Sequence, residues 1–353
     1  MKLSSWLGIA LALALFTNAR GEEDKKADRK TELKVEEILT GLNNPTGIAI
    51  PINTTDAVYV AESGAGRVIL ANPGKPGTSQ DVITGFSLDN YGPGPSYKVG
   101  PLGLSFLDRQ TLIVGDGSQA DGEELVRIYT LPKDGKALPC AETTYTLGPF
   151  PKGDGTETGE GNFYGVVTTD TAIFVTANGD DKKGWILRSE LDDEGIPIQM
   201  ELYIPTKSLT KVDAPVGITT DPLGHVVVGQ CGEISGEKDS LLTFYQPTTG
   251  SLIMSLPTGL YDIVGLAYCP TSGLLYAVDF AWNKNGEGGL YRLDRKMVDG
   301  RQSIDAVKLL SLKKPTACAF AAQGDDVALY VTEMGDSEGG KPAGRLLKIT
   351  GKL

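Results

Sequence analysis

Short apolar runs recur along the chain, each directly after a three-residue step that often reads Pro-x-Gly. Three clear copies are Pro45-Thr46-Gly47, Pro101-Leu102-Gly103 and Pro215-Val216-Gly217, and three weaker copies end at positions 165, 265 and 317. We call the last residue of each step the repeat anchor: Gly47, Gly103, Gly165, Gly217, Gly265 and Ala317. Successive anchors lie 48 to 62 residues apart, slightly more than the roughly 40–50 residues of common propeller repeats. This spacing predicts six repeats of blade size.

Each anchor is followed by two further runs rich in Val, Ile, Leu and Tyr, separated by Gly, Pro and Asp turns. In the first repeat these runs are Val58 to Val60 and Arg67 to Leu70. Short runs of this composition are typical of β-strands. No segment after residue 20 keeps the 3.6-residue period of an amphipathic helix. The pattern therefore predicts an all-β protein, a six-bladed β-propeller with four-stranded blades.

The last repeat lacks one strand, and the segment before the first repeat can supply it. The sixth repeat ends after its third run, Arg345 to Ile349. Leu33 to Leu39 is a β-compatible run without a blade of its own, and its exit Thr40-Gly41-Leu42 matches the exits of other outer strands. We predict that this N-terminal strand pairs with Arg345 to Ile349 and closes the last blade, with Leu33 and Val35 buried, because closure removes an open sheet edge.

One segment carries a family resemblance. Residues Ala57 to Val68, AVYVAESGAGRV, resemble an NHL-type repeat. The resemblance places the chain in the broad six-bladed superfamily that also holds gluconolactonase-like and strictosidine-synthase-like proteins. It extends over the mature chain at low similarity, and it implies an architecture rather than an activity, because one scaffold hosts many functions.

The N-terminus has the pattern of an export signal, with Lys2, an apolar run from Leu7 to Phe16, and small residues up to Ala19. Ten apolar residues are too few to cross about 30 Å of hydrocarbon as a helix, so we predict a signal peptide over residues 1–19, cleaved near Ala19. Residues 20–31 are too charged to bury and form a leader, and residues 32–353 form the propeller domain. We expect an exported protein, periplasmic or extracellular, without a membrane span.

Charge and histidine content exclude several functions. The formal net charge is −12, whereas non-specific nucleic-acid binding needs a basic face. His225 is the single histidine, and it follows a tight turn on the face opposite the long loops. A Ser-His-Asp or Cys-His catalytic arrangement therefore lacks a base, and a His-rich zinc site lacks its ligands. The acidity favours a cationic partner or a divalent cation.

A polar residue follows the second strand of every repeat, 13 to 16 residues after the anchor: Glu62, Asp116, Asn178, Gln230, Asp279 and Glu333. The geometry of a propeller places these six near the face that carries the longest loops. They are either a ring of oxygen ligands for Ca²⁺ or a cationic group, or caps for the backbone of the following turns. The second interpretation makes them structural.

A second set lies three residues before the anchors. Asn44, Asn162 and Asp262 come from alternating blades and could converge on the central channel as ligands of Ca²⁺ or another divalent cation. The resemblance to gluconolactonase-like proteins implies such an axial metal. Those relatives, however, carry Asn within Pro-Asn-Gly steps, where this chain has Thr46, Leu102 and other residues. A metal-dependent lactonase-type hydrolase is therefore the alternative function.

The loops of the same face combine acidic residues with aromatic ones, including Trp282. Exposed aromatic side chains among polar groups are suited to binding carbohydrate or peptide. The main functional prediction is thus a binding propeller, rather than an enzyme, whose acidic, aromatic-containing loop face takes a protein, carbohydrate or small-molecule ligand.

Overall fold

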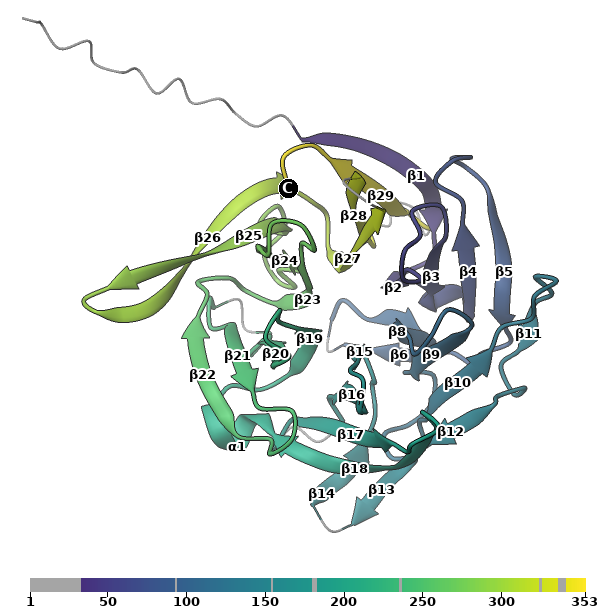
Figure 1. Ribbon diagram of the computed structural model, residues 1–353, viewed down its shortest axis with the longest axis horizontal. Coiled ribbons are helices and arrows are strands. Elements are labelled where there is room, and N and C mark those ends of the chain that lie inside the picture. Colours follow the sequence, from purple (N-terminus) through teal and green to yellow (C-terminus); the bar gives the residue numbers. More distant parts are fainter. Residues whose placement is uncertain are drawn as a thin grey trace, which may run out of the picture. The chain divides into compact units, whose positions relative to one another are not determined.

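The computed structural model describes residues 33–92, 94–153, 155–179, 183–234, 237–323, 326–335 and 341–353. These residues all belong to one of the two units of the chain, Leu33–Leu353. The segments assigned to the signal peptide and the leader lie outside the described residues. Six sheets are arranged as a ring, as Figure 1 shows. The predicted six-bladed β-propeller is confirmed.

Every blade runs from an innermost strand at the channel to an outermost strand. The first blade contains β2 (Pro45–Ala49), β3 (Val58–Glu62), β4 (Arg67–Ala71) and β5 (Ser79–Thr84), with β11 (Leu138–Pro139) added in parallel to β5. The second contains β8 (Pro101–Phe106), β9 (Thr111–Asp116), β10 (Val126–Thr130) and β12 (Tyr145–Leu147). The third contains β15 (Val166–Thr168), β16 (Ala172–Ala177), β17 (Trp185–Leu191) and β18 (Pro197–Pro205).

The fourth blade contains β19 (Pro215–Thr220), β20 (Val226–Gln230), β21 (Leu241–Tyr245) and β22 (Leu252–Pro257). The fifth contains β23 (Ile263–Tyr268), β24 (Leu275–Asp279), β25 (Gly289–Val298) and β26 (Arg301–Ser311). The long β25–β26 hairpin projects from the ring in Figure 1. The sixth contains β27 (Pro315–Gln323), β28 (Asp326–Glu333), β29 (Gly344–Thr350) and β1 (Lys34–Leu42).

Two small hairpins, β6–β7 (Asp89–Tyr91 and Tyr97–Val99) and β13–β14 (Phe150–Gly153 and Thr156–Glu160), lie in loops between blades. The helical elements among the described residues are the short α1 (Thr206–Thr210) and the 3₁₀ turn η1 (Ser63–Ala65). No helix in the described ranges is long and apolar enough to cross a membrane.

Five of the six repeat anchors are glycines, and neighbouring innermost strands approach closely at these positions. A Cβ added at Gly47 would lie 2.3 Å from the carbonyl oxygen of Leu102 in the next blade. A Cβ added at Gly103 would lie 2.2 Å from the carbonyl oxygen of Tyr164, one blade further on. Real Cβ atoms do not approach backbone oxygens this closely, so a larger residue would force the innermost strands apart. The sequence repeat is thus the consequence of packing at the channel.

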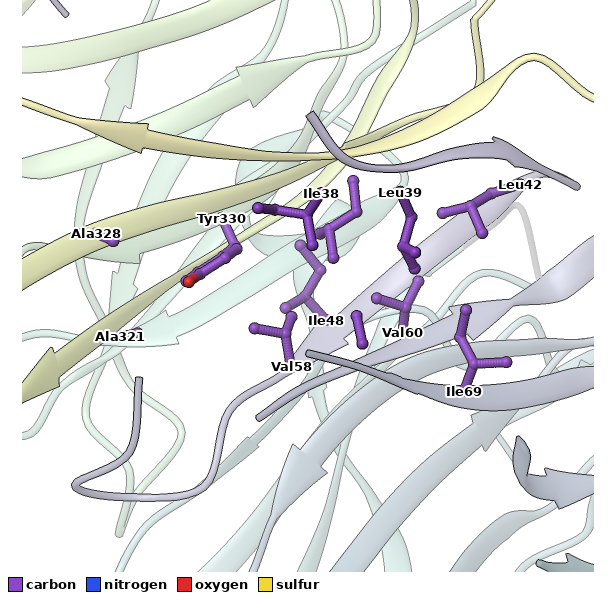
Figure 2. Packing of buried hydrophobic residues seen from close by; sticks show 12 residues of the cluster. Ile38, Leu39, Leu42, Ile48, Val58, Val60, Ile69, Ala321, Ala328 and Tyr330 are labelled. Carbon is purple, nitrogen blue, oxygen red and sulfur yellow. The ribbon is translucent and has the colours of Figure 1, made fainter. Parts of the chain in front are cut away.

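The closing strand pairs as predicted. β1 pairs antiparallel with β29 from Lys34 opposite Thr350 to Leu42 opposite Gly344. The prediction that Val35 is buried is wrong: Val35 is 45% exposed, and Leu33 is only partly buried. A register shift between Glu37 and Leu39 changes which side chains face inward, so that Ile38, Leu39 and Leu42 fill the space between the sixth and first blades (Figure 2).

Candidate functional site

The acidic residues at the ends of the second strands are held by backbone N–H groups. Asn43 donates its N–H to Glu62 Oε1 (2.9 Å), and Ser118 donates its N–H to Asp116 Oδ1 (3.0 Å). Glu333 accepts the N–H of Lys313 at 3.0 Å. These are the contacts that the turn-capping interpretation predicts.

Asp279 is held most completely, by the backbone N–H groups of Tyr261, Asp262 and Ala281 at 3.1, 2.8 and 3.2 Å. Burial raises its pKa, although these hydrogen bonds act in the opposite direction. Three of the four acids are also paired with an arginine of the third strand: Glu62 with Arg67, Asp116 with Arg127, and Glu333 with Arg345. The charges of these three acids are therefore neutralised by arginines of their own blades.

The two amides of the same set differ from each other. Gln230 is fully buried and donates to the carbonyl oxygen of Val212 (2.6 Å) and to Thr210 Oγ1 (3.1 Å). Asn178 instead lines a cavity and donates to the hydroxyl of Tyr91 at 3.0 Å. Of the six predicted ring residues, Asn178 alone is among the residues that line this cavity.

This cavity, which we call the upper cavity, has a volume of about 640 Å³ and lies at the long-loop end of the channel. Its aromatic lining residues are Tyr91, Tyr97, Tyr164, Phe280 and Trp282. Its ionisable lining residues also include Lys207, Asp213, Cys231, Glu233 and Asp262. Cavities of this size with apolar walls and a few polar groups are typical of small-molecule sites.

Tyr164 forms the floor of the upper cavity. Its hydroxyl, on the third blade, donates to the carbonyl oxygen of Thr316 on the sixth blade at 2.9 Å, which spans the channel. Tyr164 also lines a second cavity of about 470 Å³, the lower cavity, which opens among the innermost strands. The lining of the lower cavity contains no Asp, Glu, Lys, Arg or His among the described residues. The two ends of the channel therefore differ in chemistry.

The β6–β7 hairpin reaches over the upper cavity. Besides the Tyr91–Asn178 hydrogen bond, Trp282 Nε1 on the fifth blade lies 3.4 Å from the carbonyl oxygen of Gly94. Trp282 also makes edge contacts with Tyr91 and Tyr97, at ring-centroid distances of 6.0 and 5.4 Å. Trp282, predicted from its exposed loop position, thus joins a hairpin that crosses from the first two blades toward the fifth.

Asp262 is the buried carboxylate of this wall. Its Oδ2 accepts the backbone N–H of Trp282 at 2.6 Å. Burial, together with the nearby charges of Asp279 and Asp239, raises the pKa of Asp262 to about 6, although Lys314 and the Trp282 N–H lower it. Lys207, on α1, is paired with Asp213, a lining residue whose carbonyl oxygen accepts the N–H of Gly232 at 3.2 Å.

Two of the three predicted metal ligands reach the upper cavity. Asn162 and Asp262 line it, whereas Asn44 is not among its lining residues and donates to the carbonyl oxygen of Lys98 at 3.0 Å. Asn162 is held by the second blade: Glu124 accepts its backbone N–H, and Asp121 Oδ1 accepts its amide at 3.1 Å. The described ranges contain no group of three or more His, Cys, Asp or Glu side chains arranged for a metal. Two side chains fall short of the six to eight oxygens that Ca²⁺ takes.

The sequence analysis did not single out Lys207 and Asp213. Both lie in the connection from the outermost strand of the third blade to the innermost strand of the fourth. Connections of this kind lie on the long-loop face, and this position was the one feature of the sequence that could have pointed to Lys207 and Asp213. Their pairing depends on α1 and on the left-handed conformation of Lys211 that ends it, and five residues show no helical period.

One comparison with a solved structure, that with a luciferin-regenerating enzyme, supports the fold. No protein-family model matches the chain, and no curated protein sequence matches it. Among solved structures, a luciferin-regenerating enzyme superposes with a TM-score of 0.57 at 13% identity, covering 91% of this chain and 96% of that one. A virginiamycin B lyase from Staphylococcus aureus gives a TM-score of 0.49 at 12% identity, with coverages of 90% and 99%. A streptogramin B lyase gives 0.48 at 15% identity, with coverages of 91% and 98%.

At these identities the similarity concerns the fold alone. The fold defines the chain as a six-bladed β-propeller, and the upper cavity is the candidate site that it carries.

Proposed function

We propose that this chain is a binding propeller that takes a small-molecule ligand, or a side chain of a partner, into the upper cavity. The observation that carries the proposal is a partly enclosed cavity with an aromatic and polar lining. Tyr164 blocks the channel below, the β6–β7 hairpin and Trp282 cover it above, and about 640 Å³ remain between them.

The chemistry of the lining supports a ligand with an apolar body. Five aromatic rings provide flat contact surface, and Asn178, Asn162 and Asp262 place polar groups around it. A few polar groups in an apolar wall fix the orientation of a ligand and select among similar molecules. A rigid ring of blades with the site at its loop end keeps these groups in place.

The acids of the second strands do not contribute to this proposal. Glu62, Asp116, Asp279 and Glu333 are held by backbone N–H groups within the scaffold. The loop face is thus acidic partly for structural reasons, and the binding function rests on the residues that line the cavity.

The proposal is tested by a thermal-shift screen of a small-molecule library, followed by titration of each hit. Two matched variants locate the site: Ile234→Trp narrows the upper cavity, and Ile52→Trp narrows the lower one. Hits should bind the Ile234→Trp variant about tenfold more weakly and the Ile52→Trp variant with unchanged affinity. The opposite result, or a library without any saturable hit, would contradict the proposal.

We also propose that the protein acts outside the cytoplasm, because the sequence of residues 1–19 has the pattern of a signal peptide. N-terminal sequencing of the protein recovered from the periplasm or medium should begin close to residue 20. Recovery of chains that retain Met1 in the cytoplasm alone would refute it.

A further inference from the structure

The wall of the upper cavity between the fourth and fifth blades is rich in carboxylates. Asp262 and Glu233 both line the cavity, Glu233 from the loop after β20. Asp239 lies directly behind the wall, since a Cβ added at the lining residue Gly232 would lie 2.4 Å from Asp239 Oδ1. Three negative side chains therefore surround one corner of the cavity.

Two of these carboxylates, those of Asp262 and Asp239, have few hydrogen-bond donors among the described residues. Asp239 Oδ2 accepts the N–H of Glu233 at 3.1 Å, but Oδ1 is buried and has no hydrogen-bond partner among the described residues. A buried acceptor without a donor costs about 1–3 kcal/mol. Asp262 has one backbone donor, in contrast to the three that hold Asp279. The hydrogen-bond donors of the described residues therefore leave part of the charge of Asp262 and Asp239 without a direct partner.

The lysines nearest to this corner have other contacts, although the charge of Lys314 also lowers the pKa of Asp262. Lys238 lies over the ring of Tyr261 at 5.0 Å. Lys314 lies over the rings of Tyr97 and Phe280, at 5.6 and 5.2 Å, and its ammonium is 3.3 Å from the carbonyl oxygen of Trp282. Lys207 is paired with Asp213. The position of Lys314 shows that the aromatic wall accepts a cation on its ring faces.

We propose that the ligand of the upper cavity is an organic cation, an amine with an apolar body, whose ammonium is placed against Asp262 while its body contacts Tyr91, Tyr97 and Trp282. This inference rests on the proposed function and names the chemical class that it requires. An ammonium donates N–H hydrogen bonds to a carboxylate and is attracted to aromatic faces. A bare metal cation would need many more oxygen ligands than the corner supplies.

The test uses matched ligands that share one body and differ in charge: benzylamine, benzyl alcohol and benzoate, and the corresponding cyclohexyl and octyl series. Affinities are measured by calorimetry at pH 7.5 on the mature protein and on Asp262→Asn. Asp305→Asn is the control, because it removes one exposed carboxylate from the β25–β26 hairpin, where Asp305 is paired with Lys296. Glu233→Gln is the second site variant, in case Asp262→Asn does not fold.

In each series that binds, the amine should bind the wild type about tenfold or more tightly than the alcohol, because a charged hydrogen bond contributes about 1.5–3 kcal/mol. The carboxylate should bind most weakly. Asp262→Asn should abolish the preference for the amine while leaving the affinity for the alcohol unchanged, Glu233→Gln should reduce the preference, and Asp305→Asn should not alter it.

Failure of this inference differs from failure of the proposed function. If alcohols or carboxylates bind as tightly as amines, or if the preference survives in Asp262→Asn or is undiminished in Glu233→Gln, the cavity is a binding site but not one for organic cations. If no member of any series binds saturably, in agreement with an unproductive library screen, the binding function itself is refuted.

Discussion

Buried carboxylates have many partners in the closing blade and few in the wall of the upper cavity. In the closing blade, Glu333 accepts the N–H of Lys313 and pairs with Arg345, which also pairs with Glu37 on β1. In the wall of the upper cavity, Asp262 accepts the backbone N–H of Trp282, and Asp239 Oδ1 has no donor among the described residues. Both regions bury acids of the same kind near strand ends.

The difference separates scaffold from site. A carboxylate that is held by N–H groups and an arginine contributes to one fold, and its charge is not available to a ligand. A buried carboxylate that lacks such partners lowers the stability of the free protein. A cationic ligand that pairs with this carboxylate would stabilise the folded protein again. We therefore expect changes in the first region to alter stability and changes in the second to alter binding.

The largest expected effect comes from the closing strand. Deleting residues 31–39 removes most of β1, including buried Ile38 and Leu39 and their ladder with β29. The free energy of unfolding should fall by about 5 kcal/mol or more, from burial of two aliphatic side chains and several hydrogen bonds. Thermal unfolding followed by circular dichroism measures this. Deleting residues 21–30 is the control, and equal melting temperatures for the two deletions would show that the ring closes elsewhere.

The two described tryptophans should separate stability from binding. Trp185 is only 8% exposed and packs in the core between the second and third blades, so Trp185→Ala should cost about 3–5 kcal/mol. Trp282 is partly buried and contacts the rings of Tyr91 and Tyr97, so Trp282→Ala should cost less, about 1–2 kcal/mol, but weaken the ligand found in the screen about tenfold. Chemical denaturation and calorimetry measure the two effects. Similar destabilisation by both changes would mean that Trp282 is a scaffold residue.

Glu124 accepts the backbone N–H of Asn162, which lines the upper cavity, and it gives a pH-dependent test of this part of the wall. Burial and the charges of Asp116 and Asp121 raise its pKa to about 8, although hydrogen bonds from Asn162 and Gln119 lower it. Because the folded pKa exceeds the unfolded one, its contribution to stability is lost as pH rises from about 4.5 through 8. Between pH 6 and 9 the free energy of unfolding of the wild type should fall by about 2–3 kcal/mol more than that of Glu124→Gln, because each unit of pKa difference corresponds to about 1.4 kcal/mol. Parallel stability curves for the two proteins would refute this.

The smallest effect is expected at the cavity floor. Tyr164→Phe removes the hydrogen bond to the Thr316 carbonyl oxygen across the channel and keeps the ring in place. Stability should fall by about 1–2 kcal/mol, and ligand affinity should not change, because the hydroxyl is used within the scaffold. Denaturant unfolding and calorimetry of this variant give both numbers. A loss of affinity without a loss of stability would make the hydroxyl a ligand contact.

The fold could be predicted because its signals are local and repeated. The anchors mark channel positions, and at Gly47, Gly103 and Gly165 a Cβ would meet a backbone oxygen of the next blade. Leu33 to Leu39 was recognisable as the missing strand by its exit sequence. Burial of Val35 was predicted wrongly because the register shift after Glu37 depends on pairing with β29. A strand pattern alone does not reveal such a shift.

The site was less accessible to sequence reasoning, since it joins residues from distant blades. Position along the second strand could not distinguish Asn178, which lines the cavity, from Asp279, which is held by three N–H groups. Asp262 was selected for its place at the channel, and it does line the cavity; its relation to Asp239 depends on the fold of the loop after β20. The role of Tyr164 as the floor could not be predicted from the sequence, because it depends on a hydrogen bond to Thr316 in the opposite blade.

A crystal structure of the protein with the tightest-binding amine of the matched series tests the account most directly. The account predicts ligand density in the upper cavity, between Trp282 and Tyr164, with the ammonium within hydrogen-bond distance of a carboxylate oxygen of Asp262. Density in the lower cavity, or an ammonium turned away from Asp262 toward solvent, would contradict it.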